Sequence, residues 1–171
     1  MDRPLQDEYP EYYNQYINLV KEGEIISILE EQSTFVQGFL SGITEELGDK
    51  AYAFGKWTLK ETLGHLIDFE RIMAYRILCI IRGDKQSMPG FDQDEYVLKG
   101  KFFRRTIKDL TDEKLLVRAS NLILFRTTDP LDFMLRGTFN DIEISVRAML
   151  YIIAGHELHH INFIKENYLN A

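Results

Sequence analysis

Three of the four histidines in the chain lie within the five-residue segment His156-Glu157-Leu158-His159-His160. On a helix, residues four positions apart differ by about 40° around the axis, so His156 and His160 share one face. The same face carries the apolar residues Met149, Ile152, Ile153 and Phe163. A single inward-facing histidine is usually a hydrogen-bonded core residue. Two imidazoles at this spacing can instead bind one divalent metal from a single helix, and the pair therefore favours a metal site.

The same string matches the H-E-x-x-H pattern of zinc proteases, in which the glutamate is the general base. Such enzymes usually take a third ligand downstream, whereas only Glu166, and no histidine, follows His160 in this sequence. No strand is expected that could hold a peptide substrate by edge pairing. A zinc protease is therefore disfavoured, and Glu157 is expected to be a structural or rim residue.

The remaining histidine, His65, is the candidate for a third ligand. It lies about 10 Å from the start of its predicted helix, because each helical residue adds about 1.5 Å. His160 and His156 lie about 12 and 18 Å from the end of the last predicted helix by the same measure. If these two helices are antiparallel neighbours, the three imidazoles reach nearly the same level of the fold.

Polar residues on the His65 helix predict a polar, solvent-open mouth for such a site. The residues near His65 on the helical wheel are Glu61, Thr62, Asp68 and Arg76. Asp68 could accept an imidazole N–H, act as a further ligand or act as a base, and a solvated surface salt bridge explains it equally well. His159 could be an acid or base beside the metal, or an exposed histidine. Asp68 and His159 are the candidate catalytic residues.

The elements that must position these residues are four helices. Apolar spacings of three, four and seven predict helices over about 23–47, 58–83, 111–129 and 145–168. Thr58 and Glu61 form a capping box at the second start, and Gly83 is a C-terminal stop. The stretches 83–110 and 131–143 are expected to be irregular, with no strand of useful length. The result is an all-α four-helix bundle, with the long link after the second helix giving an up-down-down-up topology.

Composition bounds the remaining classes of function. The chain has 171 residues and a net charge of -7, which disfavours nucleic acid as a partner. The longest apolar run is far shorter than the roughly 20 residues that span a bilayer, so no membrane insertion is expected. The lone Cys79 cannot form an internal disulfide, and no signal peptide is evident, so a cytoplasmic location is expected. A single domain over residues 1–171 is predicted, with residues 1–20 as an N-terminal extension.

Taken in order, four segments resemble the DinB-like superfamily, which is also described as a group of metal-dependent hydrolases and includes bacterial thiol-dependent S-transferases. The segments are Lys56-Trp57-Thr58-x-x-Glu61-x-x-Gly64-His65-Leu66-x-Asp68-x-Glu70-Arg71, Pro89-Gly90-Phe91-Asp92, Ser145-Val146-Arg147 and Ile153-Ala154-Gly155-His156-Glu157-x-His159-His160. The resemblance covers about residues 25–168. It implies an up-down-down-up four-helix bundle and a homodimer. It also implies a divalent-metal triad, one histidine from the second helix and an H-x-x-x-H pair from the last, which corresponds to His65, His156 and His160.

The resemblance leaves the reaction open. Assigned members use a divalent metal, here expected to be zinc or nickel, to lower the pKa of a water or a low-molecular-weight thiol. We therefore expect a metal-dependent hydrolase or thiol S-transferase acting on a small molecule. The alternative is a non-catalytic binding or stress-response module with structural histidines. The N-terminal tyrosines Tyr9, Tyr12, Tyr13 and Tyr16 lie outside the resemblance, and a local cap on the core is preferred to a dimer surface for them.

Overall fold

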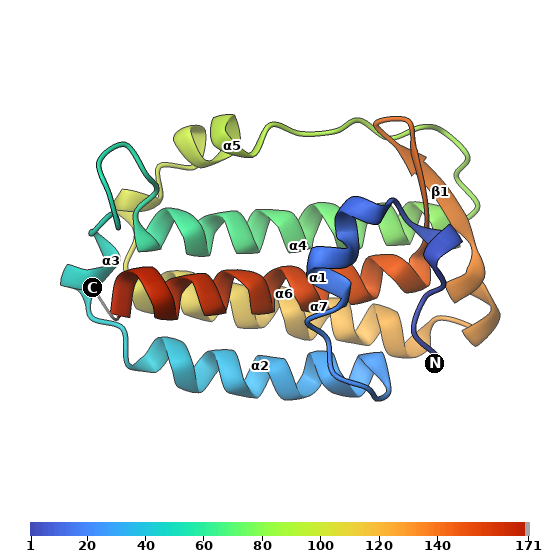
Figure 1. The fold of residues 1–171 in the computed structure, drawn as a ribbon, viewed down its shortest axis with the longest axis horizontal. Coiled ribbons are helices and arrows are strands. Elements are labelled where there is room, and N and C mark those ends of the chain that lie inside the picture. The colour runs from blue at the N-terminus through green and yellow to red at the C-terminus, as the bar shows by residue number, and fades with distance from the viewer. Residues whose placement is uncertain (170–171) are drawn as a thin grey trace.

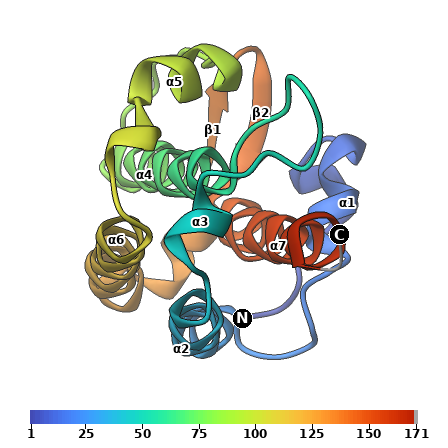
Figure 2. The same ribbon diagram turned by 90° about the vertical axis from the view of Figure 1, so that its left-hand side faces the viewer.

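Four long helices lie side by side in the computed structural model, which describes residues 1–169 (Figure 1). They are α2 (Ile25–Ser41), α4 (Leu59–Ile81), α6 (Ile107–Thr127) and α7 (Val146–Ile164). Viewed from its end, the bundle has the four helices at the corners of a square, with α4 beside α6 and α7 beside α2 (Figure 2). The prediction of an all-α four-helix bundle is confirmed.

The helices run up, down, down and up, as the colour order in Figure 1 shows. Helices α4 and α6 are parallel, since the first turns of both meet Gly48 through Lys60 and Ile107. Helices α4 and α7 are antiparallel. His65 lies opposite His156, and Thr62, one turn earlier, lies 3.5 Å from Tyr168 near the C-terminus. The long link between α4 and α6 makes this topology possible, because it returns the chain to the end where α4 began.

The helix that carries His65 begins and ends where local chemistry predicts. The Thr58 hydroxyl accepts from the Glu61 N–H, and the Glu61 carboxylate accepts from the Thr58 N–H at 2.7 Å. These bonds satisfy donors that an N-terminus would otherwise leave free. At the other end Gly83 has φ of 83°, the left-handed conformation that glycine adopts without steric cost. The capping box and the stop are both confirmed.

The most apolar predicted helix is also the most buried. Its N-cap Ser145 accepts from the Ala148 N–H at 3.0 Å. Every residue from Val146 to Glu157 is buried, which fits a helix that is apolar on all sides. The predicted span to residue 168 is continued beyond Ile164 by a π-helical turn over Lys165–Leu169.

Several boundaries differ from the predictions. The first helix breaks at Gly42, and a short α3 (Glu45–Gly48) follows. The link 83–110 contains α5 (Gln93–Gly100) and a 3-10 turn, η3 (Phe102–Arg104). The predicted start of α6 near residue 111 is wrong, because Thr106 caps the helix by accepting from the Asp109 N–H.

The expectation of no strand is also wrong, although the sheet is small. The stretch predicted to be irregular overlaps a 3-10 turn, η4 (Pro130–Met134), and a hairpin of β1 (Arg136–Phe139) and β2 (Ile142–Ser145). Asn140 and Asp141 join the strands with φ of 50° and 61°, as the tight turns of hairpins require.

The N-terminal extension packs across α7 (Figure 1). It consists of η1 (Gln6–Glu8), η2 (Glu11–Tyr13) and α1 (Asn14–Ile17). Tyr9 and Ile17 are buried in the core, which fits the predicted capping role. Glu8 is buried as well and forms an ion pair with Arg147, while the Ser145 hydroxyl donates to its carboxylate at 2.6 Å. Across residues 1–169, no helix combines the length and apolar character needed to cross a membrane.

Candidate metal centre

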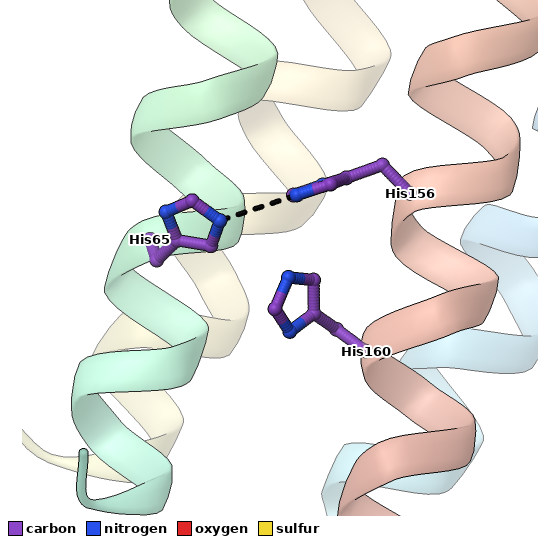
Figure 3. A group of neighbouring side chains, drawn as sticks. All are labelled: His65, His156 and His160. Atoms are coloured by element: carbon purple, nitrogen blue, oxygen red, sulfur yellow. Dashed lines mark hydrogen bonds between the residues drawn. The ribbon is translucent and has the colours of Figure 1, made fainter. Parts of the chain in front are cut away.

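Three imidazoles converge between α4 and α7 (Figure 3). The Nε2 atoms of His65 and His156 lie 3.2 Å apart. The His160 ring centroid is 4.5 Å from that of His156 and 5.0 Å from that of His65. One ligand atom from each of the three lies within 4.8 Å of the others, and in the described chain they form the one such group of metal-ligating side chains. The predicted convergence of the three histidines is confirmed.

Burial keeps these imidazoles neutral. It lowers the pKa of His65 to about 4 and, with a contribution from the His65 and His159 charges, that of His160 to about 3. Burial and then the neighbouring histidines hold the pKa of His156 well below its ordinary value. A neutral imidazole has a free lone pair, which is the form that binds a metal.

The donor set fits a divalent transition metal. Three neutral nitrogens from two rigid helices match the ligand type of open three-histidine sites, and no carboxylate belongs to the group. The Nδ1 atom of His160 is buried and has no hydrogen-bond partner among the described residues. An unpaired polar atom in such surroundings is costly unless a ligand satisfies it.

Aromatic rings surround the cluster on the sides that face the protein. Phe69 stacks on His156 with ring centroids 3.8 Å apart, and Trp57 lies 5.0 Å from His65. Tyr16, from the N-terminal extension, approaches His156 edge-on at 5.2 Å. These rings fix the imidazole orientations and exclude water. Tyr16 was not predicted to belong to the site. The repeated tyrosines of the extension were noticed in the sequence, but they were interpreted as a cap on the core.

A pocket of about 480 Å³ opens on the remaining side, against His160. Its walls are mainly aromatic and come from the loop before α4 and the end of α7. Its lining includes the ring-bearing residues Tyr52, Trp57, His159, His160, Phe163 and Tyr168. The pocket has the size of a small-molecule site. The mouth of the pocket combines these rings with the polar residues Lys56, Thr62, Asp94 and His159, and of the predicted polar set it contains Thr62.

The two candidate catalytic residues lie in different places. His159 lines the pocket, and its ring is 5.2 Å from that of His160. Asp68 is half-buried and is not part of the histidine group. Burial raises the Asp68 pKa, and its charged neighbours are Arg71, Arg105 and Glu113, of which the last two belong to the loop before α6 and to α6 itself. The structure thus brings His159, but not Asp68, to the pocket.

Glu157, the glutamate of the H-E-x-x-H string, is directed into the bundle. It is buried and forms ion pairs with Lys114 and, at 3.2 Å, with Arg118. Both cations also pair with Glu70 at 2.7 Å, so two carboxylates and two cations form one buried network. Glu157 is therefore a structural residue, as expected, and does not line the pocket where a protease would need its base.

Arg76, on the same face of α4 as His65, does not reach the pocket either. Its guanidinium lies 4.0 Å from the Phe139 ring centroid and donates to the Pro89 carbonyl at 2.8 Å. It thereby holds the link after α4 and the hairpin against the helix.

The fold and the cluster together define a class: four-helix bundles with up-down-down-up topology and a histidine triad between the second and last long helices. The profile of the DinB superfamily matches residues 28–164, and this chain belongs to that superfamily.

Two known proteins are similar to the chain. A protein of Oceanobacillus iheyensis, named "putative metal-dependent hydrolase", is 26% identical over 129 residues, which cover 74% of this chain and 73% of the relative. The solved structure of YfiT from Bacillus subtilis superposes with a TM-score of 0.73 and 19% identity, over 90% of this chain and 95% of YfiT. YfiT is described as "a probable metal-dependent hydrolase with an unusual four-helix bundle topology". At this identity the likeness to YfiT shows the shared fold.

Proposed function

We propose that this chain is a metal-dependent hydrolase of a small molecule, with His65, His156 and His160 holding one divalent transition metal, zinc or nickel. The observation that carries the proposal is a cluster of three converging imidazoles, two buried and the third, His160, at the wall of a ligand-sized pocket. The name of the Oceanobacillus relative supports the same activity. A divalent metal held there supplies Lewis acidity and lowers the pKa of a water or thiol, so that a nucleophile forms at neutral pH.

The residues of the chain divide the remaining work. Phe69, Trp57 and Tyr16 pack against the imidazoles and hold them in place, and Trp57 also forms part of the pocket wall. His159 lies at the edge of the pocket and is the proposed proton acceptor and donor for the reacting groups. We propose no catalytic role for Asp68, whose charged neighbours are on the α6 side.

A second candidate, transfer of a low-molecular-weight thiol, is favoured by the scarcity of proton acceptors in the pocket. Among residues 1–169, the pocket lining contains one carboxylate, that of the exposed Asp94, and one histidine outside the cluster, His159. A free thiol has a pKa of about 8.5 and water about 15.7, so a thiol needs less help in losing its proton. A pocket of about 480 Å³ also has room for a small thiol beside an electrophile.

Metal content tests the proposed centre. The protein is purified without chelators or a nickel column, and its metals are counted by mass spectrometry. We expect about one transition-metal ion per chain, and loss of it in His65→Ala, His156→Ala and His160→Ala. His159→Ala is the matched control and should keep the metal, because His159 lies outside the cluster. Equal, negligible metal in the wild type and in His156→Ala would contradict the proposal and favour a non-catalytic module.

A paired substrate screen separates the two activities. One arm follows hydrolysis of model esters and amides, and the other follows conjugation of a model electrophile by several cellular thiols. Activity in the first arm alone supports the hydrolase, and thiol-dependent activity alone supports the transferase. In either case His159→Ala should lower turnover and leave the metal content unchanged.

The homodimer and the cytoplasmic location implied at the sequence level stay predictions. Sedimentation equilibrium of the purified chain tests the first, and cell fractionation tests the second.

A further inference from the structure

The wall of the pocket is built from aromatic side chains that hold one another in place. Tyr52, on the loop before α4, meets Phe163 edge-on at 5.0 Å and Tyr168 at 5.6 Å between ring centroids. The Tyr168 hydroxyl donates to the Trp57 carbonyl at 2.6 Å and so ties the C-terminal turn to that loop. The rings are therefore ordered before any ligand enters, which reduces the entropy lost on binding.

The aromatic wall is continuous with the histidine cluster. Trp57 borders the pocket and also packs against His65, and His160 forms part of the pocket surface. If a flat group of a substrate lay against these rings, the substrate bond that adjoins this group would lie beside His160. At about 480 Å³ the pocket is too large for a single small polar molecule such as water or urea to fill, and its aromatic wall can contact a larger apolar group.

The rim of the pocket carries two opposite charges. Lys56 and Asp94 both line it and both are exposed. Neither forms an ion pair with any other residue between 1 and 169, and together they add no net charge. The rim therefore gives no preference to an anion or a cation, and a ligand without net charge fits it best.

We propose that the pocket binds an uncharged aromatic ring of the substrate, so that the substrate class is a neutral aryl compound whose reacting bond adjoins the ring. The position of the reacting bond rests on the proposed function, whereas recognition of the ring does not. Ring-on-ring contacts prefer stacked or edge-to-face geometries, which the existing Tyr52, Phe163 and Tyr168 arrangement offers to one more ring.

The chain contains one tryptophan, Trp57, so intrinsic fluorescence reports directly on this pocket. The probes are benzamide and cyclohexanecarboxamide, which share the amide and the ring size and differ in aromaticity. We expect benzamide to bind at least about fivefold more tightly, because only its flat ring can stack. In Tyr52→Leu and in Phe163→Leu, which keep the wall apolar, the preference should fall to about twofold or less.

Phe54→Leu is the matched control. Phe54 belongs to the same loop as Tyr52 and Trp57 but is fully exposed and does not line the pocket. It should leave the benzamide preference unchanged. Equal binding of the two probes, no response to benzamide up to its solubility, or a preference that persists in both wall variants would each overturn the proposal.

Metal content measured on the same samples keeps the two proposals separate. Bound metal without an aromatic preference would overturn the substrate class and leave the metal-dependent hydrolase standing. An aromatic preference in a protein without metal would support the substrate class and overturn the metal-dependent hydrolase.

Discussion

Gly155 precedes the first histidine of the H-x-x-x-H pair and lies where the N-terminal extension packs directly against α7. A Cβ atom at this position would lie 2.0 Å from the Tyr16 carbonyl oxygen. The absence of a side chain lets the backbone of α1 lie directly against α7, and this contact brings the Tyr16 ring to His156. Gly155 thus shapes the site although it has no side chain to bind a metal or a substrate.

Replacing Gly155 with alanine should lower the free energy of unfolding by about 1–3 kcal/mol, because α1 must move away to make room. Urea denaturation measures the change. Gly38→Ala on α2 is the control: nothing lies within 4 Å of its Cβ position. There the better helix propensity of alanine should stabilise the protein by about 0.5–1 kcal/mol. An equal increase in the free energy of unfolding in both variants would show that the close contact with Tyr16 is not maintained in solution.

The residues of the site differ in how far the sequence could predict them. Helix periodicity is rigid, so the convergence of His65, His156 and His160 followed from spacing once α4 and α7 were taken as antiparallel neighbours. Their role as metal ligands stays a prediction. Tyr16 could not be placed the same way, because α1 has only four residues and joins α2 through irregular chain. Its position depends on tertiary contacts such as the one at Gly155.

The elements show the same division between local and tertiary causes. Helix α4 was predictable because its capping box and its stopping glycine are local signals. Helix α6 begins at Ile107, four residues before the predicted start near residue 111, since Ile107 and Leu110 are buried in the core and Thr106 caps the helix. The hairpin escaped prediction because each strand has only four residues, too few for alternation to be distinct.

One of the contacts that hold the N-terminal extension is the buried ion pair of Glu8 and Arg147, which can be tested directly. Glu8→Ala leaves Arg147 buried without its carboxylate and should lower the free energy of unfolding by about 3 kcal/mol. Amide hydrogen exchange in this variant should be faster than in the wild type over residues 5–17, and the increase should be larger there than elsewhere. Glu11→Ala, an exposed position in the same extension, should change neither quantity. Unchanged protection of residues 5–17 in Glu8→Ala would contradict this anchoring role.

At the scale of the whole molecule, the buried ionic network joins all four long helices at mid-height. Glu70 of α4 and Glu157 of α7 pair with Lys114 and Arg118 of α6, and Arg118 also donates to the Leu29 carbonyl of α2 at 3.1 Å. Because Glu157 follows His156 directly, this network fixes the register of α7 against α4. The three imidazoles therefore depend on contacts outside the pocket for their mutual placement.

The network also gives a pH dependence to the stability of the bundle. Burial raises the pKa of Glu70, but Lys114 and Arg118 outweigh it, and the pKa falls from 4.5 to about 2. Between these values the unfolded chain takes up the proton first, so the contribution of Glu70 is complete above about pH 4.5 and is lost as the pH falls toward 2. Glu70→Gln abolishes this titration and leaves two buried cations facing the single carboxylate of Glu157.

We therefore expect Glu70→Gln to cost about 3–5 kcal/mol of unfolding free energy near pH 6. The cost should be about 1 kcal/mol smaller near pH 4, where the wild type has begun to lose the same contribution. Urea denaturation at both pH values measures the difference. Glu46→Gln is the control, because its carboxylate is exposed and pairs only with Lys50, so it should have little effect at either pH. A cost that is equal at the two pH values would mean that Glu70 does not titrate as an ion-paired carboxylate, and the network would then not hold the four helices together by charge.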